Sequence, residues 1–587
     1  MRRIMPGETV GKGRAMAMSS SKHRIRTSAL RSAGAAFGVA ALFASGLVAA
    51  SHSFAAQDAL PLTGRITSST GETLAGIPVK AHLDNSNISV AVYTNKQGEY
   101  SFPSWSDVKP GSYSVAVELP DFEHVKKDAV SIASGKTMRV DFTLKARPVA
   151  YEDATASEII AALPGTDHQK VLFSQCSNCH TLQWALQIPR SKEQWVKVIR
   201  MAGRAADSVT PDTYAFSQKQ FIEPLADYLT SIRGPGSSDN VPFKPRPRPT
   251  DDASTNLVVT EYNLPRGGQR DIFMLRGDPA YVWPHDVIVN DKYAYYTDHF
   301  SYVLGRLDRT TGEVTEMPFP LPTGAGRDAM GGDGRPGNPG GGAHELQFDR
   351  QGDVIVGMNK GTVKYDPLTG KFIRWSTGDA MFGLDPQGNV WHLPRNGQLT
   401  KLETGSEAMK LTVYPIPQNS GIYDIDTDSK GRTDLYIWRD GKIGIFDPRD
   451  ISYAEYKTPT PMAGPRRGQI DAQDRLWAAE FYAGQIAMFD PDKKVIKEYP
   501  LAGKAYTAPY AEPYSASVDD KNQLVWTNDF SSSRIYKLDV KTGKMTEYMT
   551  PTNYEVRDFK VEQGAPRPTV WIPAYRPPSK LVKIQVR

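Results

Sequence analysis

The residues with the clearest chemistry in this chain are Cys176, Cys179 and His180, which form the run Cys-Ser-Asn-Cys-His. A Cys-x-x-Cys-His run is the attachment signal for a c-type haem. The two thiols add to the vinyl groups of the porphyrin, and the adjacent imidazole becomes an axial ligand of the iron. The run therefore predicts one covalent haem c, with His180 as the proximal ligand, and one-electron chemistry.

Two other uses of a Cys-x-x-Cys pair compete with this interpretation. Cys176 and Cys179 are the only cysteines in 587 residues. A thioredoxin-like redox pair would leave His180 without a role. A structural zinc site needs about four ligands, and no second Cys/His pair lies nearby in the sequence. Haem attachment is the interpretation that uses all three residues.

Met201 is the candidate for the distal iron ligand. It follows the haem motif in a stretch of helical periodicity whose apolar stripe consists of Trp195, Val198, Ile199 and Ala202. At 100° per residue Met201 lies off that stripe, so we expect the stripe to pack in the core and Met201 to face the haem. A thioether ligand raises the reduction potential. The alternatives are an ordinary packing role for Met201, or ligation by His168 or Met274.

A second group of polar residues lies at the predicted starts of repeated strands in the C-terminal half. It includes the pairs His285-Asp286 and His344-Glu345, and the glycine-rich segment 324–342 precedes the second pair. Comparable positions in other repeats carry Asp298-His299, Arg466-Arg467, Glu480 and Glu512. Imidazoles and carboxylates can bind a divalent ion such as Mg²⁺ or exchange protons near neutral pH. The candidate catalytic residues are His285, His344, Glu345 and Glu480, and solvated strand ends without a role are the alternative.

The haem motif lies within residues 151–233, whose periodicity is helical. Ser191 and Gln194 form an S-x-x-Q capping box that predicts a helix start. A later helical stretch ends before Gly234-Pro235-Gly236. The order of helix, haem motif, middle helix and closing Asp-Tyr-Leu helix resembles a small cytochrome c domain. That resemblance implies a small all-α fold around the haem, and the family's W-x-x-x-x-x-M pattern also indicates Met201.

Residues 255–587 repeat a pattern of strands about every 40 to 50 residues, which is the spacing of a β-propeller. Each unit has an apolar strand, a D-x-x-G-type turn, a second strand with Trp or Tyr, and two further strands. The units count to about seven blades of about four strands, a seven-bladed β-propeller. Residues 258–265 read as an outer strand without a preceding blade, and the last unit, ending at 581–587, lacks an outer strand. We expect the two to pair and close the ring.

These repeats resemble the virginiamycin B lyase (streptogramin lyase) family. The resemblance covers residues 255–587 and implies a lyase-like propeller, in which the family's lyase uses a histidine and a glutamate with Mg²⁺. Glu512-Pro513-Tyr514 stands where the family has an E-x-H segment, and Arg467 occupies a histidine-like position. Glu480 is retained within Trp477-Ala478-Ala479-Glu480. Because the general base and one carboxylate are missing, we do not expect streptogramin lyase activity.

Residues 57–148 alternate apolar and polar positions between turn signals, which predicts a small Greek-key β-sandwich. Short strands are expected at 79–83, 113–117 and 138–142. The pattern T-x-x-x-G-x-Y-x-F, which starts at Thr94, resembles the carboxypeptidase regulatory-like family. That resemblance implies an accessory sandwich without a peptidase site. A Pro-rich linker at 234–254 separates the helical region from the repeats and permits several domain arrangements.

The first 56 residues read as a signal peptide. A basic stretch precedes the apolar run 33–50, which small residues close. Residues 1–56 carry eight Lys/Arg and one acidic residue. Removing seven net positive charges from a formal +5 leaves a mature chain near −2, which gives no case for nucleic-acid binding. We expect a periplasmic or secreted protein without stable membrane insertion.

Together these features predict a mainly β, multidomain periplasmic c-type cytochrome. The favoured function is electron transfer by an oxidoreductase whose propeller binds a small-molecule substrate or a periplasmic redox protein. A metal-dependent carbon–oxygen lyase of the virginiamycin B lyase type is the second hypothesis. A non-catalytic binding protein is the third, since sandwiches and propellers are common interaction modules.

Overall fold

The computed structural model describes residues 60–178, 180–207, 219–268, 280–320, 342–358, 361–417, 421–501, 512–530 and 532–587. Residues 58–587 form one compact unit. The predicted signal peptide, Cys179, Met274 and nearly all of the glycine-rich segment 324–342 lie outside the described residues. Among the described residues, no helix is both long and apolar enough to cross a bilayer.

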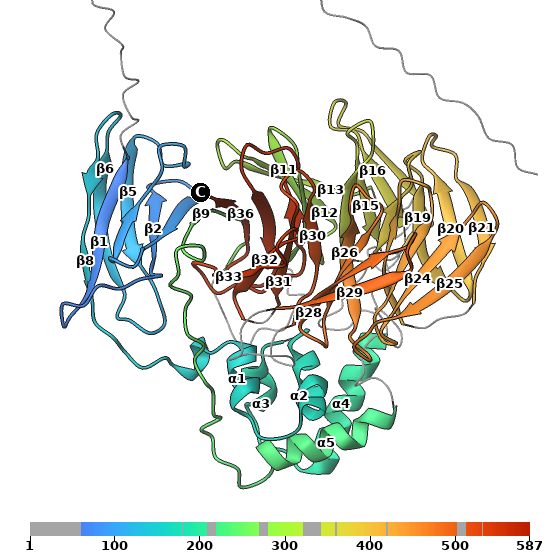
Figure 1. Ribbon diagram of the computed structural model, residues 1–587, viewed down its shortest axis with the longest axis horizontal. Helices are drawn as coiled ribbons and strands as arrows, with labels where there is room; N and C mark the ends of the chain where they lie inside the picture. The colour runs from blue at the N-terminus through green and yellow to red at the C-terminus, as the bar shows by residue number, and fades with distance from the viewer. Residues whose placement is uncertain are drawn as a thin grey trace, which may run out of the picture. The chain divides into compact units, whose positions relative to one another are not determined.

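The N-terminal part is a two-sheet β-sandwich (blue in Figure 1). One sheet has the order β4-β1-β7 with β8 also paired to β1, and the other contains β3-β2-β5-β6. Along β1, Leu62, Gly64 and Ile66 are buried while the intervening residues are not, which is the period-two pattern of a strand with one face in the core. The strands are β1 (Leu62–Ser68), β2 (Pro78–Leu83), β3 (Ile88–Tyr93), β4 (Glu99–Ser101), β5 (Gly111–Val117), β6 (Val125–Ile132), β7 (Met138–Arg139) and β8 (Phe142–Leu144).

The helical region follows as a small bundle (teal to green in Figure 1). The predicted capping box forms: the Ser191 N–H donates to Gln194 Oε1 (2.8 Å), and the Gln194 N–H donates to Ser191 Oγ (3.4 Å). Trp195 and Ile199 then lie one turn apart on the buried face. The helices are η1 (Tyr151–Asp153), α1 (Ala156–Ala162), α2 (Asp167–Ser174), η2 (Gln175–Asn178), α3 (Leu182–Leu186), α4 (Lys192–Asp207) and α5 (Lys219–Arg233).

The C-terminal part is an array of four-stranded antiparallel sheets, in which consecutive strands are neighbours (green to red in Figure 1). Among the described residues, six such sheets stand alone. Their strands are β10 (Pro284–Val289), β11 (Tyr293–Asp298), β12 (Val303–Asp308), β13 (Val314–Pro318); β14 (Ala343–Phe348), β15 (Val354–Met358), β16 (Gly361–Tyr365), β17 (Phe372–Trp375); β18 (Phe382–Leu384), β19 (Val390–Arg395), β20 (Gln398–Glu403), β21 (Lys410–Pro415); β22 (Ile422–Thr427), β23 (Thr433–Ile437), β24 (Lys442–Asp447), β25 (Ser452–Lys457); β26 (Pro465–Ile470), β27 (Leu476–Glu480), β28 (Gln485–Asp490), β29 (Val495–Pro500); β30 (Ala516–Asp519), β31 (Leu524–Asp529), β32 (Arg534–Asp539) and β33 (Met545–Met549).

The array closes on itself, as a β-propeller does. First strands of successive sheets pack together, and β10 of the first sheet packs against β35 (Thr569–Ala574) near the end of the chain. Between the second and third sheets, Glu345 donates its N–H to the Ala380 carbonyl, and its carboxylate accepts the Phe382 N–H. The predictions of a mainly β chain and a propeller array are confirmed.

The last set of strands takes its outer strand from the start of the repeat region. β9 (Leu257–Asn263) pairs antiparallel with β36 (Lys580–Val586), beyond β34 (Lys560–Val561) and β35, as the sequence predicts. The other edge of β9 pairs with β3 of the sandwich. One eight-stranded sheet therefore joins the sandwich to the propeller, which the sequence did not predict.

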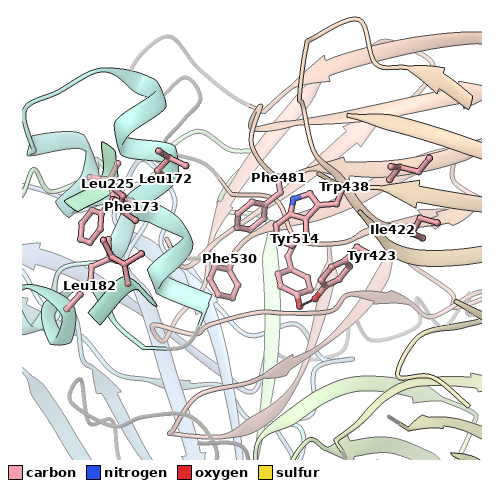
Figure 2. Packing of buried hydrophobic residues seen from close by; sticks show 14 of the residues in the cluster. Leu172, Phe173, Leu182, Leu225, Ile422, Tyr423, Trp438, Phe481, Tyr514 and Phe530 are labelled. Atoms are coloured by element: carbon pink, nitrogen blue, oxygen red, sulfur yellow. Dashed lines mark hydrogen bonds between the residues drawn. The ribbon is translucent and has the colours of Figure 1, made fainter. Parts of the chain in front are cut away.

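The helical region packs against the propeller through one hydrophobic cluster. Figure 2 shows Leu172, Phe173 and Leu225 on the helices and Phe530 and Tyr514 on the propeller side of this cluster. The linker 234–254 also makes specific bonds: Arg246 reaches Glu547 Oε2 (3.0 Å), and Arg248 reaches Asp121 Oδ2 (2.6 Å). These contacts fix the linker against the sandwich and the propeller, in one of the domain arrangements that its Pro-rich composition permits.

Candidate functional site

The haem motif begins in η2, between α2 and α3. Cys176 is half-buried there, and the His180 ring lies 4.4 Å from the Trp184 ring, centroid to centroid. The His180 Nδ1–H donates to the Thr181 carbonyl at 2.9 Å, which leaves Nε2 as the nitrogen with a lone pair. Burial lowers the pKa of His180 to about 4, so its imidazole is neutral at physiological pH. A neutral imidazole oriented through its other nitrogen is the form in which histidine binds metals.

Cys176 and His180 line the same cavity. Apart from one arginine, the rest of its wall is apolar. These residues are Phe173, Trp184, Ala185, Arg190, Trp195, Val198, Ile199, Ala202, Leu225 and Leu229. A thiol and an imidazole in an apolar setting are the groups that hold a c-type haem. The described residues of the motif therefore fit that cofactor.

Met201 does not join this cavity. Its side chain is 66% exposed, whereas the stripe that we expected to pack away from the haem (Trp195, Val198, Ile199, Ala202) lines the cavity wall. The apolar pattern of α4 does not distinguish a cavity wall from a core, because a haem pocket and a hydrophobic core both select apolar side chains. His168 is exposed as well and lies against Phe221. The assignment of Met201 as the distal ligand stays a prediction that this geometry does not support.

The propeller places two rings of side chains around its centre. One set lies at the second residue of β10, β14, β22 and β26 and just before β30 and β34, and consists of His285, His344, Tyr423, Arg466, Tyr514 and Arg557. The residue after each of these belongs to the second set, the axial ring, which consists of Asp286, Glu345, Asp424, Arg467, Ser515 and Asp558. All twelve side chains are at least nine-tenths buried. The repeat thus brings chemically different residues to equivalent positions.

Arg467 is the centre of the axial ring. Its guanidinium lies 3.3 Å from Asp424, 3.4 Å from Asp558, 3.7 Å from Glu345 and 3.9 Å from Asp286. Burial raises the pKa values of Glu345 and Asp424 to about 7, against the opposing effect of Arg467. These carboxyls can therefore exchange protons near neutral pH.

Asp286 and Asp558 form an unequal pair beside this arginine. Burial and the neighbouring Asp558 raise the pKa of Asp286 well above its usual value. Burial also opposes ionisation of Asp558, but Arg467 and Lys560 outweigh it and lower the pKa of that carboxyl. The two carboxyls titrate as a coupled pair, in which the charges of Arg467 and Lys560 favour the ionised form of Asp558.

Three histidines meet next to this ring. His285 on β10, His299 after β11 and His344 on β14 each offer a ring nitrogen, and these nitrogens all lie within 4.8 Å of one another. The sequence indicates His285 and His344 as candidate catalytic residues, whereas His299 appears there only within the Asp298-His299 pair of a comparable repeat position. The end of β11 lies beside the start of β10, so the Asp298-His299 pair was the signal that could have added it.

The other predicted residues lie apart from the histidines. Glu480, at the end of β27, is buried and accepts a hydrogen bond from Gln485 Nε2 (2.7 Å). Burial and Glu498 raise the pKa of Glu480 to about 8. Glu512 contacts the helical region, where Ser177 Oγ donates to its carboxylate at 3.5 Å. Neither carboxylate contributes to the histidine cluster.

The haem motif and the propeller meet at a shared hollow. Its wall includes His180 and Ser177 from the helical region and Glu555, Arg576 and Phe530 from the propeller. Arg576 is paired with Glu555, and the preceding residue, Tyr575, is hydrogen-bonded to His299. The chain segment 575–576 therefore touches both candidate sites.

Comparison with known proteins identifies one part of the chain by sequence. Residues 61–145 match the carboxypeptidase regulatory-like domain family, which confirms the predicted accessory sandwich. No curated protein matches the chain.

Several solved propellers are similar in structure. Virginiamycin B lyase from Staphylococcus aureus is 17% identical, with 56% of this chain and 100% of that chain covered and a TM-score of 0.44. A streptogramin B lyase is 18% identical, with 57% and 100% covered and a TM-score of 0.45. The RRP9 WD40 repeats are 11% identical, with 52% and 95% covered and a TM-score of 0.41.

Proposed function

We propose that this chain is a c-type cytochrome whose helical region holds one covalent haem and whose propeller, with about seven blades, receives a substrate or redox partner. The observation that carries the proposal is the cavity that Cys176 and His180 line together. When bound, the haem supplies reversible one-electron transfer at its iron. Haem c is attached outside the cytoplasm, so the proposal includes a periplasmic or secreted location.

The chain's own residues prepare this cavity for a metal-bound group. The Thr181 carbonyl fixes the ring of His180 through Nδ1, which presents Nε2. The indoles of Trp184 and Trp195 and the aliphatic side chains around them exclude water. An apolar surrounding of this kind raises the reduction potential, because it disfavours the more highly charged oxidised state.

The propeller supports an oxidoreductase rather than a simple electron carrier. Oxidation of an organic substrate releases protons together with electrons, so proton-accepting groups are needed near a one-electron centre. Glu345 and Asp424, with pKa values of about 7, are such groups. The hollow between His180 and Arg576 lies where the helical region meets the propeller, and Tyr575, next to Arg576, is hydrogen-bonded to His299.

A metal-dependent lyase is the second candidate, and the cluster of His285, His299 and His344 favours it. Such a lyase would act in the propeller alone and would not need the cysteines. Binding without turnover is the remaining possibility for both modules.

The test uses the mature chain produced in a strain that attaches c-type haem. We expect the haem to remain with the protein after acid–acetone extraction, and to do so in the exposed-residue control His168→Ala. The double variant Cys176→Ala/Cys179→Ala should lose it. Absence of covalent haem from the wild-type chain would refute the cytochrome assignment.

The ferric protein is then mixed with pooled small-molecule fractions, and its absorption bands are followed. Reduction by one fraction, lost in His285→Ala or His344→Ala, supports the oxidoreductase. Turnover that requires a divalent metal and survives the cysteine double variant supports the lyase instead.

A further inference from the structure

We propose that His285, His299 and His344 form a binding site for a transition-metal ion, separate from the haem site and independent of the proposed electron-transfer function. The three side chains come from two neighbouring sheets of the propeller, and they are 0%, 3% and 7% exposed. One ring nitrogen from each lies within 4.8 Å of the other two. The ring centroids are 4.3 Å apart for His285–His344, 4.0 Å for His299–His344 and 5.0 Å for His285–His299.

His285 supplies the second, independent observation. Its side chain is fully buried, yet neither ring nitrogen has a hydrogen-bond partner among the described residues. A buried polar group without a partner is destabilising, and such groups are rare in native proteins. A metal ion between the three rings would occupy one of these nitrogens, which gives the burial of His285 a physical reason.

His299 is held in an orientation suited to this role. Its Nδ1 is hydrogen-bonded to the Tyr575 hydroxyl at 2.7 Å, so Nε2 is the ring nitrogen that would bind the metal. Its backbone N–H donates to the Trp283 carbonyl at 3.0 Å, so the residue is fixed at both ends. Metal-binding histidines are commonly oriented in this way by a partner on the other ring nitrogen.

Gly342 gives the ring of His299 its space. A Cβ at position 342 would lie 2.2 Å from His299 Cδ2 and 2.6 Å from Nε2, closer than atoms approach one another. Any side chain at this position must therefore displace the imidazole that faces the cluster. The glycine therefore keeps open the space that the His299 ring occupies in the cluster.

The donor set selects the class of metal. Metal–nitrogen bonds are about 2.0–2.1 Å long, so two nitrogens on one tetrahedral ion stand about 3.3 Å apart. Ring movements of about 1 Å would bring the present nitrogens to that separation. Three neutral imidazoles suit Zn²⁺, Cu²⁺ and other borderline first-row ions, whereas Mg²⁺ prefers oxygen ligands. The Mg²⁺ that the family resemblance implied does not fit this cluster.

The experiment uses the full mature chain without a polyhistidine tag. The protein is stripped with a chelator, dialysed against Zn²⁺ or Cu²⁺, and analysed for metal per chain by elemental analysis, in which haem iron is counted separately. We expect one Zn²⁺ or Cu²⁺ per chain, a rise in Tm on loading, and electron paramagnetic resonance of the Cu²⁺ form that shows nitrogen coupling.

The variants distinguish a site from surface binding. His285→Ala and Gly342→Ala should each lower the affinity at least tenfold, while the exposed-residue control His124→Ala should bind as the wild type does. Gly342→Ala keeps all three ligands, so it serves even where a histidine variant fails to fold. The cysteine double variant should still bind the metal, which separates this result from failure of the cytochrome proposal. Loading below about one-tenth equivalent, or equal affinity in Gly342→Ala, would overturn the site.

Discussion

At the scale of single residues, buried carboxyls decide how this protein responds to pH. Glu345, Asp424 and Glu480 all have raised pKa values, of about 7, 7 and 8, chiefly because burial disfavours their charged forms. Their folded-state pKa values exceed the unfolded ones, so the folded chain holds extra protons between about pH 4 and 8. The stability that these protons contribute is lost as the pH rises through that window.

Glu480→Gln tests this directly. The amide keeps an acceptor for Gln485 and removes the cost of ionising a buried carboxyl. The variant should match the wild type near pH 4.5 and become more stable as the pH rises, by a few kcal/mol, until the difference levels off above about pH 8. Urea unfolding from pH 4.5 to 9 measures it. The exposed turn residue Glu313 gives the control Glu313→Gln, which should leave the pH profile unchanged, and parallel profiles for both variants would contradict the prediction.

At the scale of elements, a turn between the first two strands recurs through the propeller. Asp471 accepts N–H bonds from residues two and four positions later and also the indole N–H of Trp477 (2.8 Å). Asp349, Asp385 and Asp428 each accept the backbone N–H groups of the residues two and four positions later in their own turns. In those three turns a glycine with φ of 78–86° occupies the position that requires left-handed backbone. The D-x-x-G signature therefore encodes a hydrogen-bonded turn. Because this turn lies between the first two strands of a sheet, it allows their positions to be predicted from the sequence.

Asp471→Ala should destabilise the propeller by about 1–3 kcal/mol, because it leaves a buried indole donor and two turn amides without their acceptor. The matched change Asp471→Asn keeps the Oδ1 acceptor of the turn and loses the bond from Trp477, so about half of that effect is expected. Differential scanning calorimetry measures both. Equal Tm values for the two variants would show that the indole bond alone matters.

At the scale of the whole molecule, the sandwich and the propeller share one sheet and one buried ion network. Glu261 on β9 is 1% exposed and lies 3.0 Å from Lys80 of the sandwich and 2.8 Å from Lys580 of β36. Burial opposes its ionisation, but the two lysines outweigh burial and lower the pKa of Glu261. Because the folded-state pKa lies below the unfolded one, this network stabilises the fold above about pH 4.5 and weakens as the pH falls further.

Glu261→Gln should cost about 3–5 kcal/mol at pH 7, since the ammonium groups of the buried Lys580 and the partly buried Lys80 lose their counter-charge. Calorimetry should show a single transition for the sandwich and propeller in the wild type and two transitions in the variant. The control Glu123→Gln removes an exposed partner of Lys145 within the sandwich and should change stability by less than about 1 kcal/mol. An unsplit transition in Glu261→Gln would mean that β3–β9 pairing alone couples the two parts.

The sequence by itself determined the features that depend on local pattern. The alternation in residues 57–148, the Ser191–Gln194 capping box and the recurring aspartate turns each fix backbone geometry within a few residues. The pairing of β9 with β36 was also predictable from the sequence. One segment reads as an outer strand without a blade, and the last blade lacks an outer strand, so pairing the two completes that blade. The Cys-x-x-Cys-His run likewise predicts its chemistry from a local pattern of five residues.

Only the tertiary structure decided which distant residues meet. His299 joins His285 and His344 because adjacent strands bring their ends together, and Arg467 reaches four carboxylates because the sheets converge on one axis. Apolar periodicity on α4 could not say whether its stripe faces a core or a cavity, and only the structure shows that the stripe lines a cavity while Met201 is exposed. Contacts between residues far apart in the chain depend on packing, which no local pattern encodes.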